Sequence, residues 1–229
     1  MRGVRAGEGL DADASALLGY LPARHSGRHG GSRELLIGPG ARVRSGSVLY
    51  LGSSIGAGLQ TGHNVVIRED CAIGDSVCVW SNSVVDHGCR IGDRVKIHSN
   101  CYVAQFTEIA DDAFLAPGVT VANDLYPGQP QSAQVMSGPW IGAGAQIGVN
   151  ATILPFVRIG AGSLIGAGAT VARNIPDGAV AYGNPATVHG TVADLAPIGT
   201  RITAVPASAS RYRFTEPAAD QQFRQAGTP

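Results

Sequence analysis

Aliphatic side chains recur at every sixth position over most of the chain. Counting in steps of six from Ile37 to Val121, and again from Ile141 to Val171, gives 21 positions, of which 20 hold Ile, Leu or Val. The position that follows is often glycine: Gly38, Gly56, Gly74, Gly92, Gly142, Gly160 and Gly166. A period of six matches neither the 3.6 residues of a helical turn nor the alternation of a strand. The pattern therefore indicates a repeated six-residue unit.

Such a unit suits short strands separated by turns on a triangular prism. Three hexads close one coil, with the large aliphatic side chain inside, a small side chain at the corner, and glycine where the turn needs unusual dihedral angles. The sequence thus predicts an all-β parallel β-helix with coils over residues 37–122 and 141–176. A loop of residues 123–140 interrupts the repeat.

The two ends of the chain lack this regularity. We expect residues 1–36 to form an irregular N-terminal segment in which residues 17–21 supply one short element over the first coil. The β-helix domain then covers residues 37–190, and residues 191–229 form a C-terminal tail without hexad register.

Composition narrows the class of protein. The 229 residues contain 17 basic and 17 acidic side chains, so the formal net charge is zero. Without a net positive charge to attract phosphates, nucleic acid is disfavoured as a partner. No apolar run approaches the ~18 residues of a membrane span or resembles a signal peptide, which predicts a cytoplasmic protein without a membrane partner. The four cysteines include no CxxC pair and do not suggest a disulfide scaffold.

Residues that are three hexads apart should stack on one corner of the prism, about 4.8 Å from one another. One such column contains Glu69, His87, Gln105 and Asn123. A carboxylate at Glu69 could accept the proton of one imidazole nitrogen of His87 and leave the other nitrogen free as a general base. The alternative is a solvated polar ladder without a catalytic role.

A second column contains Asn64, Asn82 and Asn100. Asparagine tolerates left-handed turn conformations and forms side-chain ladders, so a structural role is the first interpretation. Asn100 is kept as a candidate catalytic residue.

Several stretches resemble the nucleotide-amino-sugar N-acyltransferases of the hexapeptide-repeat acyltransferase superfamily. They are TGHNVVIRE (61–69), IHSNCYV (97–103), FLAPGVTVANDLYP (114–127) and GNPA (183–186). The resemblance implies a left-handed parallel β-helix and an acyl-CoA donor, with acetyl-CoA as the expected cofactor.

A further stretch, VDHGCRIG (85–92), resembles the segment that carries the general-base histidine in related acyltransferases, which puts the base at His87. Those relatives commonly have an acidic residue after the histidine, where this chain has Gly88. Glu69 or Asp86 must then orient the imidazole. In some sugar N-acyltransferases of this type no protein base is thought to be needed, and His87 and Asn100 would then only position the amine.

The resemblance also implies a homotrimer that binds CoA between neighbouring prisms. Small side chains such as Ala116 and Ala167 would let the pantetheine arm approach, and Arg173 in VARNIP (171–176) would meet the CoA end, with Lys96 as a weaker candidate.

The interrupting loop lies beside the polar column. Asn123, Asp124 and Tyr126 should therefore face the acceptor, with Gln105 and His63 as further candidate substrate contacts. The alternative is a loop that only braces the trimer.

These observations predict a CoA-dependent N-acetyltransferase acting on a nucleotide-linked amino sugar. The alternatives are an O-acetyltransferase, a non-catalytic scaffold, and a metal enzyme similar to the hexapeptide-repeat carbonic anhydrases. Zinc ligands must lie within ~4.2 Å of one another, whereas His63 and His98 should be ~9.6 Å apart and His87 lies on another corner. We therefore expect no metal. The sequence specifies neither the sugar and its nucleotide nor the acyl length.

Overall fold

The computed structural model describes residues 3–22 and 34–195. The chain divides into two compact units, residues 1–192 and residues 193–229, and only residues 193–195 of the second unit are described. No helix in the described part of the chain is long and apolar enough to cross a membrane. The predicted tail of residues 191–229 thus falls almost entirely outside the described residues.

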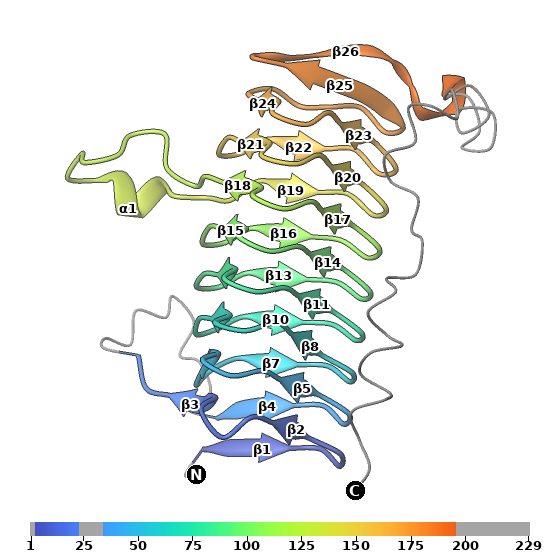
Figure 1. Ribbon diagram of the computed structural model, residues 1–229. Helices are drawn as coiled ribbons and strands as arrows, with labels where there is room; N and C mark the ends of the chain where they lie inside the picture. The colour runs from blue at the N-terminus through green and yellow to red at the C-terminus, as the bar shows by residue number, and fades with distance from the viewer. Residues whose placement is uncertain (1–2, 23–33, 196–229) are drawn as a thin grey trace, which may run out of the picture. The chain divides into compact units, whose positions relative to one another are not determined.

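Residues 3–22 and 34–192 form a left-handed parallel β-helix whose coils stack along three sheets (Figure 1). The first sheet contains β1 (Val4–Ala6), β4 (Leu35–Ile37), β7 (Ser54–Ile55), β10 (Ala72–Ile73), β13 (Arg90–Ile91), β16 (Glu108–Ile109), β19 (Trp140–Ile141) and β22 (Arg158–Ile159). The third sheet contains β3 (Leu17–Tyr20), β6 (Val48–Tyr50), β9 (Val66–Ile67), β12 (Val84–Val85), β15 (Tyr102–Val103), β18 (Thr120–Val121), β21 (Thr152–Ile153) and β24 (Thr170–Val171).

The second sheet is longer because a terminal hairpin extends it. Its parallel strands are β2 (Asp11–Ala12), β5 (Arg42–Val43), β8 (Gln60–Thr61), β11 (Cys78–Val79), β14 (Lys96–Ile97), β17 (Phe114–Leu115), β20 (Gln146–Ile147) and β23 (Leu164–Ile165). The hairpin consists of β25 (Ala179–Gly183) and the antiparallel β26 (Ala186–Thr191), and η1 (Val192–Asp194) follows it. The hexad pattern did not predict this hairpin, because its strands are longer than the repeat allows.

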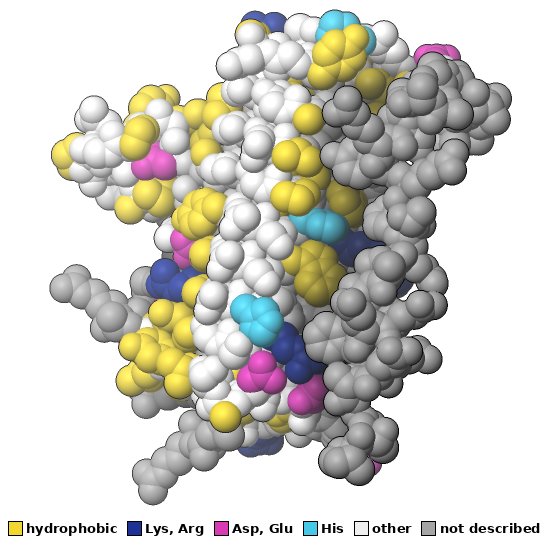
Figure 2. All heavy atoms as spheres, viewed as in Figure 1, with side chains coloured by type: hydrophobic (Ala, Val, Ile, Leu, Met, Phe, Trp, Pro, Cys, Tyr) yellow, Lys and Arg dark blue, Asp and Glu magenta, His cyan; other side chains and the backbone are white. Residues whose placement is uncertain are grey.

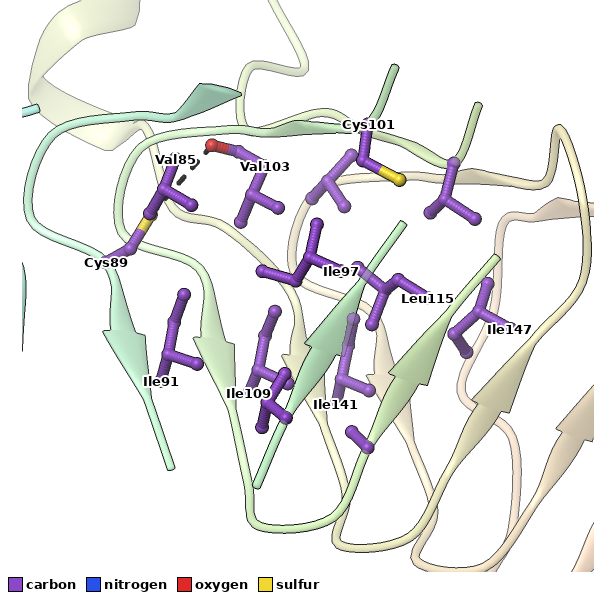
Figure 3. Packing of buried hydrophobic residues seen from close by; sticks show 14 of the residues in the cluster. Val85, Cys89, Ile91, Ile97, Cys101, Val103, Ile109, Leu115, Ile141 and Ile147 are labelled. Atoms are coloured by element: carbon purple, nitrogen blue, oxygen red, sulfur yellow. Dashed lines mark hydrogen bonds between the residues drawn. The ribbon is translucent and has the colours of Figure 1, made fainter. Parts of the chain in front are cut away.

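The predicted aliphatic positions fill the interior of the prism. Each two-residue strand points its second side chain inward, so that Ile97, Leu115 and Ile147 stack in consecutive coils and are at most 1 % exposed (Figure 3). Cys89 and Cys101 also point inward and are buried in the core. Burying each such aliphatic side chain contributes roughly 1.5 to 3 kcal/mol to folding.

The corners of the prism explain the asparagine column. Asn64, Asn82 and Asn100 have φ angles of 56°, 62° and 62°, in the left-handed region that asparagine tolerates. The side-chain amide of Asn64 also donates to Asn82 Oδ1 at 3.3 Å. Asparagine thus suits the turns at the corner between the second and third sheets.

The β-helix begins earlier than the sequence analysis placed it. β1, β2 and β3 pair in parallel with β4, β5 and β6, so residues 4–20 form a complete first coil and not an irregular segment. Two features hid the coil: alanine occupies two of its aliphatic positions, and the connection from Ala6 to its partner Ile37 is longer than the three hexads of a regular coil. The short element predicted at residues 17–21 is β3, within that coil.

The interruption predicted from the repeat lies between β18 and β19. Residues 122–139 leave the prism at the corner between the third and first sheets, and they carry the short helix α1 (Ser132–Val135) (Figure 1). Figure 2 shows hydrophobic side chains on this projecting loop, among which Leu125, Tyr126 and Val135 are exposed. We refer to residues 122–139 as the corner loop.

Candidate active site

The predicted polar column lies at the corner between the third and first sheets, from which the corner loop projects. The backbone N–H of Gly88 donates to Glu69 O, and that of Phe106 donates to His87 O, each at 3.1 Å. Glu69, His87 and Gln105 therefore occupy equivalent places in consecutive coils. Asn123 continues the column at the start of the corner loop and accepts the N–H of Ser137 from the loop's end at 3.0 Å.

His87 lines a pocket between this corner and the end of the corner loop. The pocket has a volume of about 500 Å³, and its walls include Asp70, Arg90, Phe106 and Met136. The side chain of His87 is 8 % exposed, and the Phe106 ring meets the imidazole edge to face with 5.3 Å between centroids. The site thus combines one titratable ring with apolar and charged walls, as small-molecule sites commonly do.

One ring nitrogen of His87 is buried without a hydrogen-bond partner. Nδ1 lies 3.8 Å from Glu69 Oε1 and 3.7 Å from Asp70 Oδ2, beyond hydrogen-bond distance in both cases. The predicted hydrogen bond between Glu69 and His87 is therefore absent. Buried polar atoms are rarely left unpaired, so this nitrogen calls for a functional explanation.

Glu69 is held elsewhere because Arg68 takes both of its carboxylate oxygens. Arg68 Nε donates to Oε2 and Nη2 donates to Oε1, both at 2.8 Å. Burial alone would raise the pKa of Glu69, but the hydrogen bonds and charge of Arg68 outweigh it and lower the pKa below its ordinary value. Glu69 is consequently an ionised partner of arginine.

Arg68 also reaches Asp86, which has further donors of its own. Arg68 Nη1 lies 3.4 Å from Asp86 Oδ1, Tyr102 donates its hydroxyl to Asp86 Oδ2 at 2.7 Å, and the backbone N–H of His87 donates to Oδ1 at 2.7 Å. We call Arg68, Glu69, Asp86 and Tyr102 the Arg68 network. Through Asp86, the network holds the backbone N–H of the histidine.

The network predicts an unusual titration of Tyr102. Burial and the hydrogen bond to Asp86 raise the pKa of this phenol to about 12, from an ordinary value of about 10. Because the pKa of Tyr102 is higher in the folded than in the unfolded state, its contribution to the free energy of unfolding is fully present below about pH 10. This contribution is lost as the pH rises toward 12. Wild type should therefore lose more stability than Tyr102→Phe over this range, as measured by urea unfolding at each pH. A tyrosinate absorbance step near pH 10 that disappears in Tyr102→Phe would contradict the assignment.

The structure explains why glycine follows the histidine. Gly88 has φ 69°, and a Cβ built on it would lie 2.9 Å from Cδ1 of Phe106. The aromatic ring thus occupies the space that an acidic side chain at this position would need.

The remaining candidate substrate residues are divided between two corners. Gln105, Asn123 and Asp124 are partly exposed near the pocket's corner, and Asp124 Oδ1 accepts the backbone N–H of Tyr126 at 2.7 Å. His63 and Asn100 lie at the corner between the second and third sheets. Within one chain, the structure does not bring His63 or Asn100 to His87.

The predicted CoA contacts also lie away from His87. Lys96 is exposed on β14, Ala116 is buried at the corner between the second and third sheets, and Ala167 is exposed at the same corner. Arg173 is exposed just after β24, four coils beyond β12 on the third sheet. Because Ala116 is buried, it offers little surface to a ligand arm on this chain.

Within one chain, the described histidines are not grouped with other metal-ligating side chains. Among the described residues, no three His, Cys, Asp or Glu side chains are grouped closely enough to hold an ion. His63 Nδ1 is already within 2.7 Å of Ser45 Oγ.

We therefore expect acyl transfer to survive exhaustive treatment with EDTA, because no step needs a metal ligand set. The check is the initial rate before and after chelation, with a buffer-only sample treated in parallel. Activity that EDTA removes and zinc alone restores would contradict this expectation.

Sequence reasoning missed Arg68, Asp70, Phe106 and Met136 as parts of the site. The first two flank Glu69 in one turn, and Phe106 lies one coil beyond Gly88, so aligning whole corner turns would have found these three. Met136 carried no signal, since its position depends on the path of the corner loop.

Comparison with known proteins agrees with this architecture. The family model described as bacterial transferase hexapeptide (six repeats) matches residues 52–87, 88–123 and 138–173. A comparison with curated proteins found no match by sequence.

Two solved structures share the fold. A Bacillus cereus protein described as an acetyltransferase is 23% identical to this chain, with a TM-score of 0.50. The alignment covers 66% of this chain and 83% of the Bacillus cereus chain. UDP-N-acetylglucosamine acyltransferase from Campylobacter jejuni is 16% identical to this chain, with a TM-score of 0.52. The alignment covers 93% of this chain and 82% of the Campylobacter jejuni chain.

Proposed function

The chain contains bacterial transferase hexapeptide repeats, and from this premise we propose that it is an acyltransferase that acylates the amine of a nucleotide-linked amino sugar. The acyl group, which we take to be acetyl, would come from acetyl-CoA. The proposal rests on the position of His87, which lines a pocket of about 500 Å³. Its Nδ1 is buried and faces the carboxylates of Glu69 and Asp70. Nε2 is then the nitrogen available to the pocket.

In the proposed reaction, the neutral amine of the acceptor attacks the thioester carbonyl carbon of acyl-CoA. The new C–N bond forms, the C–S bond breaks, and CoA leaves as the thiolate. Nε2 of His87 takes the proton that the attacking nitrogen must lose, and the resulting imidazolium passes it to the thiolate or to solvent. A backbone N–H would stabilise the oxyanion.

The corner loop supports an acceptor site on this side of the prism. Met136 and Ser137 line the same pocket as His87, and Asn123, Asp124 and Tyr126 stand at the loop's opposite end. Tyr126 offers an exposed aromatic face and a hydroxyl, which suit a sugar ring or a nucleobase.

We expect the active form to be a trimer with CoA between neighbouring prisms. Val48, Val66 and Val84 stack on the outer face of the third sheet, and such an apolar stripe favours burial against another copy. Light scattering at micromolar concentration should return three times the chain mass of 23.4 kDa, and Val66→Asp should lower it. A fully active monomer would contradict an intersubunit CoA site.

The proposed function is tested by offering acyl-CoA donors of increasing length to a panel of nucleotide-linked amino sugars. Release of free CoA thiol, with mass spectrometry of the product, measures transfer. Matched sugars with a hydroxyl in place of the amine distinguish N-transfer from O-transfer. The proposal fails if no amine acceptor is acylated faster than its hydroxyl counterpart.

A further inference from the structure

The unpaired nitrogen of His87 raises the question of which acid orients the ring. General-base histidines are held in one tautomer by an acceptor for the other ring N–H. Three carboxylates surround His87 in this chain: Glu69 and Asp70 from the coil before it, and Asp86 from its own turn. Gly88 leaves no acid in the following position.

Two of these carboxylates already have their oxygens engaged. Both oxygens of Glu69 accept N–H groups of Arg68 at 2.8 Å. Asp86 Oδ1 accepts the backbone N–H of His87 and Oδ2 accepts the hydroxyl of Tyr102, each at 2.7 Å. Charge-assisted hydrogen bonds within the Arg68 network therefore hold both carboxylates in place.

Asp70 is differently placed. Its Oδ2 is the carboxylate oxygen nearest to Nδ1, at 3.7 Å, and it lines the same pocket as His87. Among the described residues, His87 is the only basic side chain within ion-pair distance of Asp70. Catalytic hydrogen bonds are often long in unliganded enzymes and tighten when the substrate binds.

The backbone at Asp70 is compatible with glycine. Its φ is 59°, in the left-handed region, whereas the coils on either side have glycine at the equivalent positions, Gly52 and Gly88. Aspartate is among the few residues that tolerate this conformation, but glycine adopts it without steric cost. The fold therefore does not require aspartate at this position, and Asp70→Gly can remove the carboxylate without straining the turn.

We propose that Asp70 is the positioning residue of this site: its carboxylate accepts a hydrogen bond from Nδ1–H of His87 and leaves Nε2 free to take the proton of the acceptor. The inference rests on the proposed function for the role of Nε2, whereas the contact between Asp70 and Nδ1 stands independently of it. Related acyltransferases commonly have an acidic residue directly after the histidine, but here that position is Gly88 and Phe106 fills the space beside it. Asp70, in the preceding coil, supplies a carboxylate in its place.

The contact is tested first without activity, by ¹⁵N NMR of the histidine ring nitrogens in the unliganded protein near pH 8. The His87 signal is assigned by its loss in His87→Ala. We expect the Nδ1–H tautomer in wild type and a shift toward Nε2–H in Asp70→Gly, which removes the acceptor but suits the φ angle. Asp112→Gly, which replaces an aspartate with the same φ of 59° at another corner, should leave the His87 signal unchanged.

Kinetics provide the second readout. Asp70→Gly should lower kcat roughly tenfold to a hundredfold, a part of the full general-base contribution, with little change in KM for acyl-CoA. Asp70→Asn should lose less, because its amide oxygen still accepts a hydrogen bond. Glu69→Gln should retain the Nδ1–H tautomer.

The outcomes separate the two proposals. A wild-type Nε2–H tautomer, or a tautomer and rate that Asp70→Gly leaves unchanged, overturns the role of Asp70. If no acceptor is acylated by any form of the protein while the tautomer still depends on Asp70, the proposed function fails and the Asp70 contact stands.

Discussion

Replacing His87 with alanine is expected to lower kcat for acyl transfer by a factor of about 100 to 10,000, the range that general-base removal usually costs. The dissociation constant for CoA should change little, because in the proposed reaction the imidazole acts on the acceptor's proton and not on the donor. Stopped-time assays of thiol release at saturating substrate give kcat, and calorimetric titration gives CoA affinity.

His189→Ala serves as the matched control, since His189 is exposed on β26 in the terminal hairpin. Its kcat should equal that of wild type. If His87→Ala instead keeps more than about a third of the wild-type rate at neutral pH, proton removal by this side chain is excluded on the same magnitudes. Substrate-assisted transfer without a protein base would then account better for the reaction.

The second large effect is expected on stability, when Arg68 is replaced by leucine. The side chains of Glu69 and Asp86 are 4 % and 9 % exposed, so the substitution leaves two buried carboxylates without their cation. Breaking a buried ion pair in this way typically costs about 3 to 5 kcal/mol. Because Arg68 itself is 34 % exposed, we expect about 3 kcal/mol, measured by urea unfolding at pH 7.

Arg94→Leu provides the comparison, because Arg94 also contacts several carboxylates but is 53 % exposed, and its partners Asp93, Asp111 and Asp112 are each at least 43 % exposed. Such exposed pairs contribute little to stability, so Arg94→Leu should lose much less than Arg68→Leu. Equal losses for the two arginine variants would contradict the assignment of a buried network.

The cost of Arg68→Leu should also depend on pH. Arg68 lowers the folded-state pKa of Glu69, so the stability it gives is present above the unfolded pKa of about 4.3 and is lost as the pH falls through the lower folded value. The difference between wild type and variant should therefore shrink on acidification below about pH 4. A difference that stays constant down to pH 2 would count against this mechanism.

The sequence was sufficient to predict the coils because a six-residue period states directly which side chain points inward. Ile97, Leu115 and Ile147 could be placed in successive layers by counting. The same counting placed His87 one coil beyond Glu69, as the structure does. It failed at the first coil, where Ala6 and Ala12 stand in the aliphatic positions and give no period to count.

Counting hexads also predicted which residues form the polar column, but it did not predict which of their side chains form hydrogen bonds. Glu69 was expected to orient His87, but its carboxylate instead accepts two hydrogen bonds from Arg68, its neighbour in the chain. A periodic pattern specifies which residues stack between coils, whereas side-chain reach decides which of them pair. For the same reason, the contact between Phe106 and His87 became visible only once the rings were placed.

The corner loop has a consequence for how this molecule can change. β18 and β19 pair with β15 and β16 in the same register that the uninterrupted coils use, although the chain between Val121 and Ile141 is much longer than the single hexad that the period requires. Strand pairing, and not the length of the connection, sets where the hexads resume. Insertions or deletions in the corner loop can therefore reshape the wall beside His87 without moving an inward aliphatic side chain, so that substrate preference can diverge among descendants of this protein while its scaffold is inherited intact.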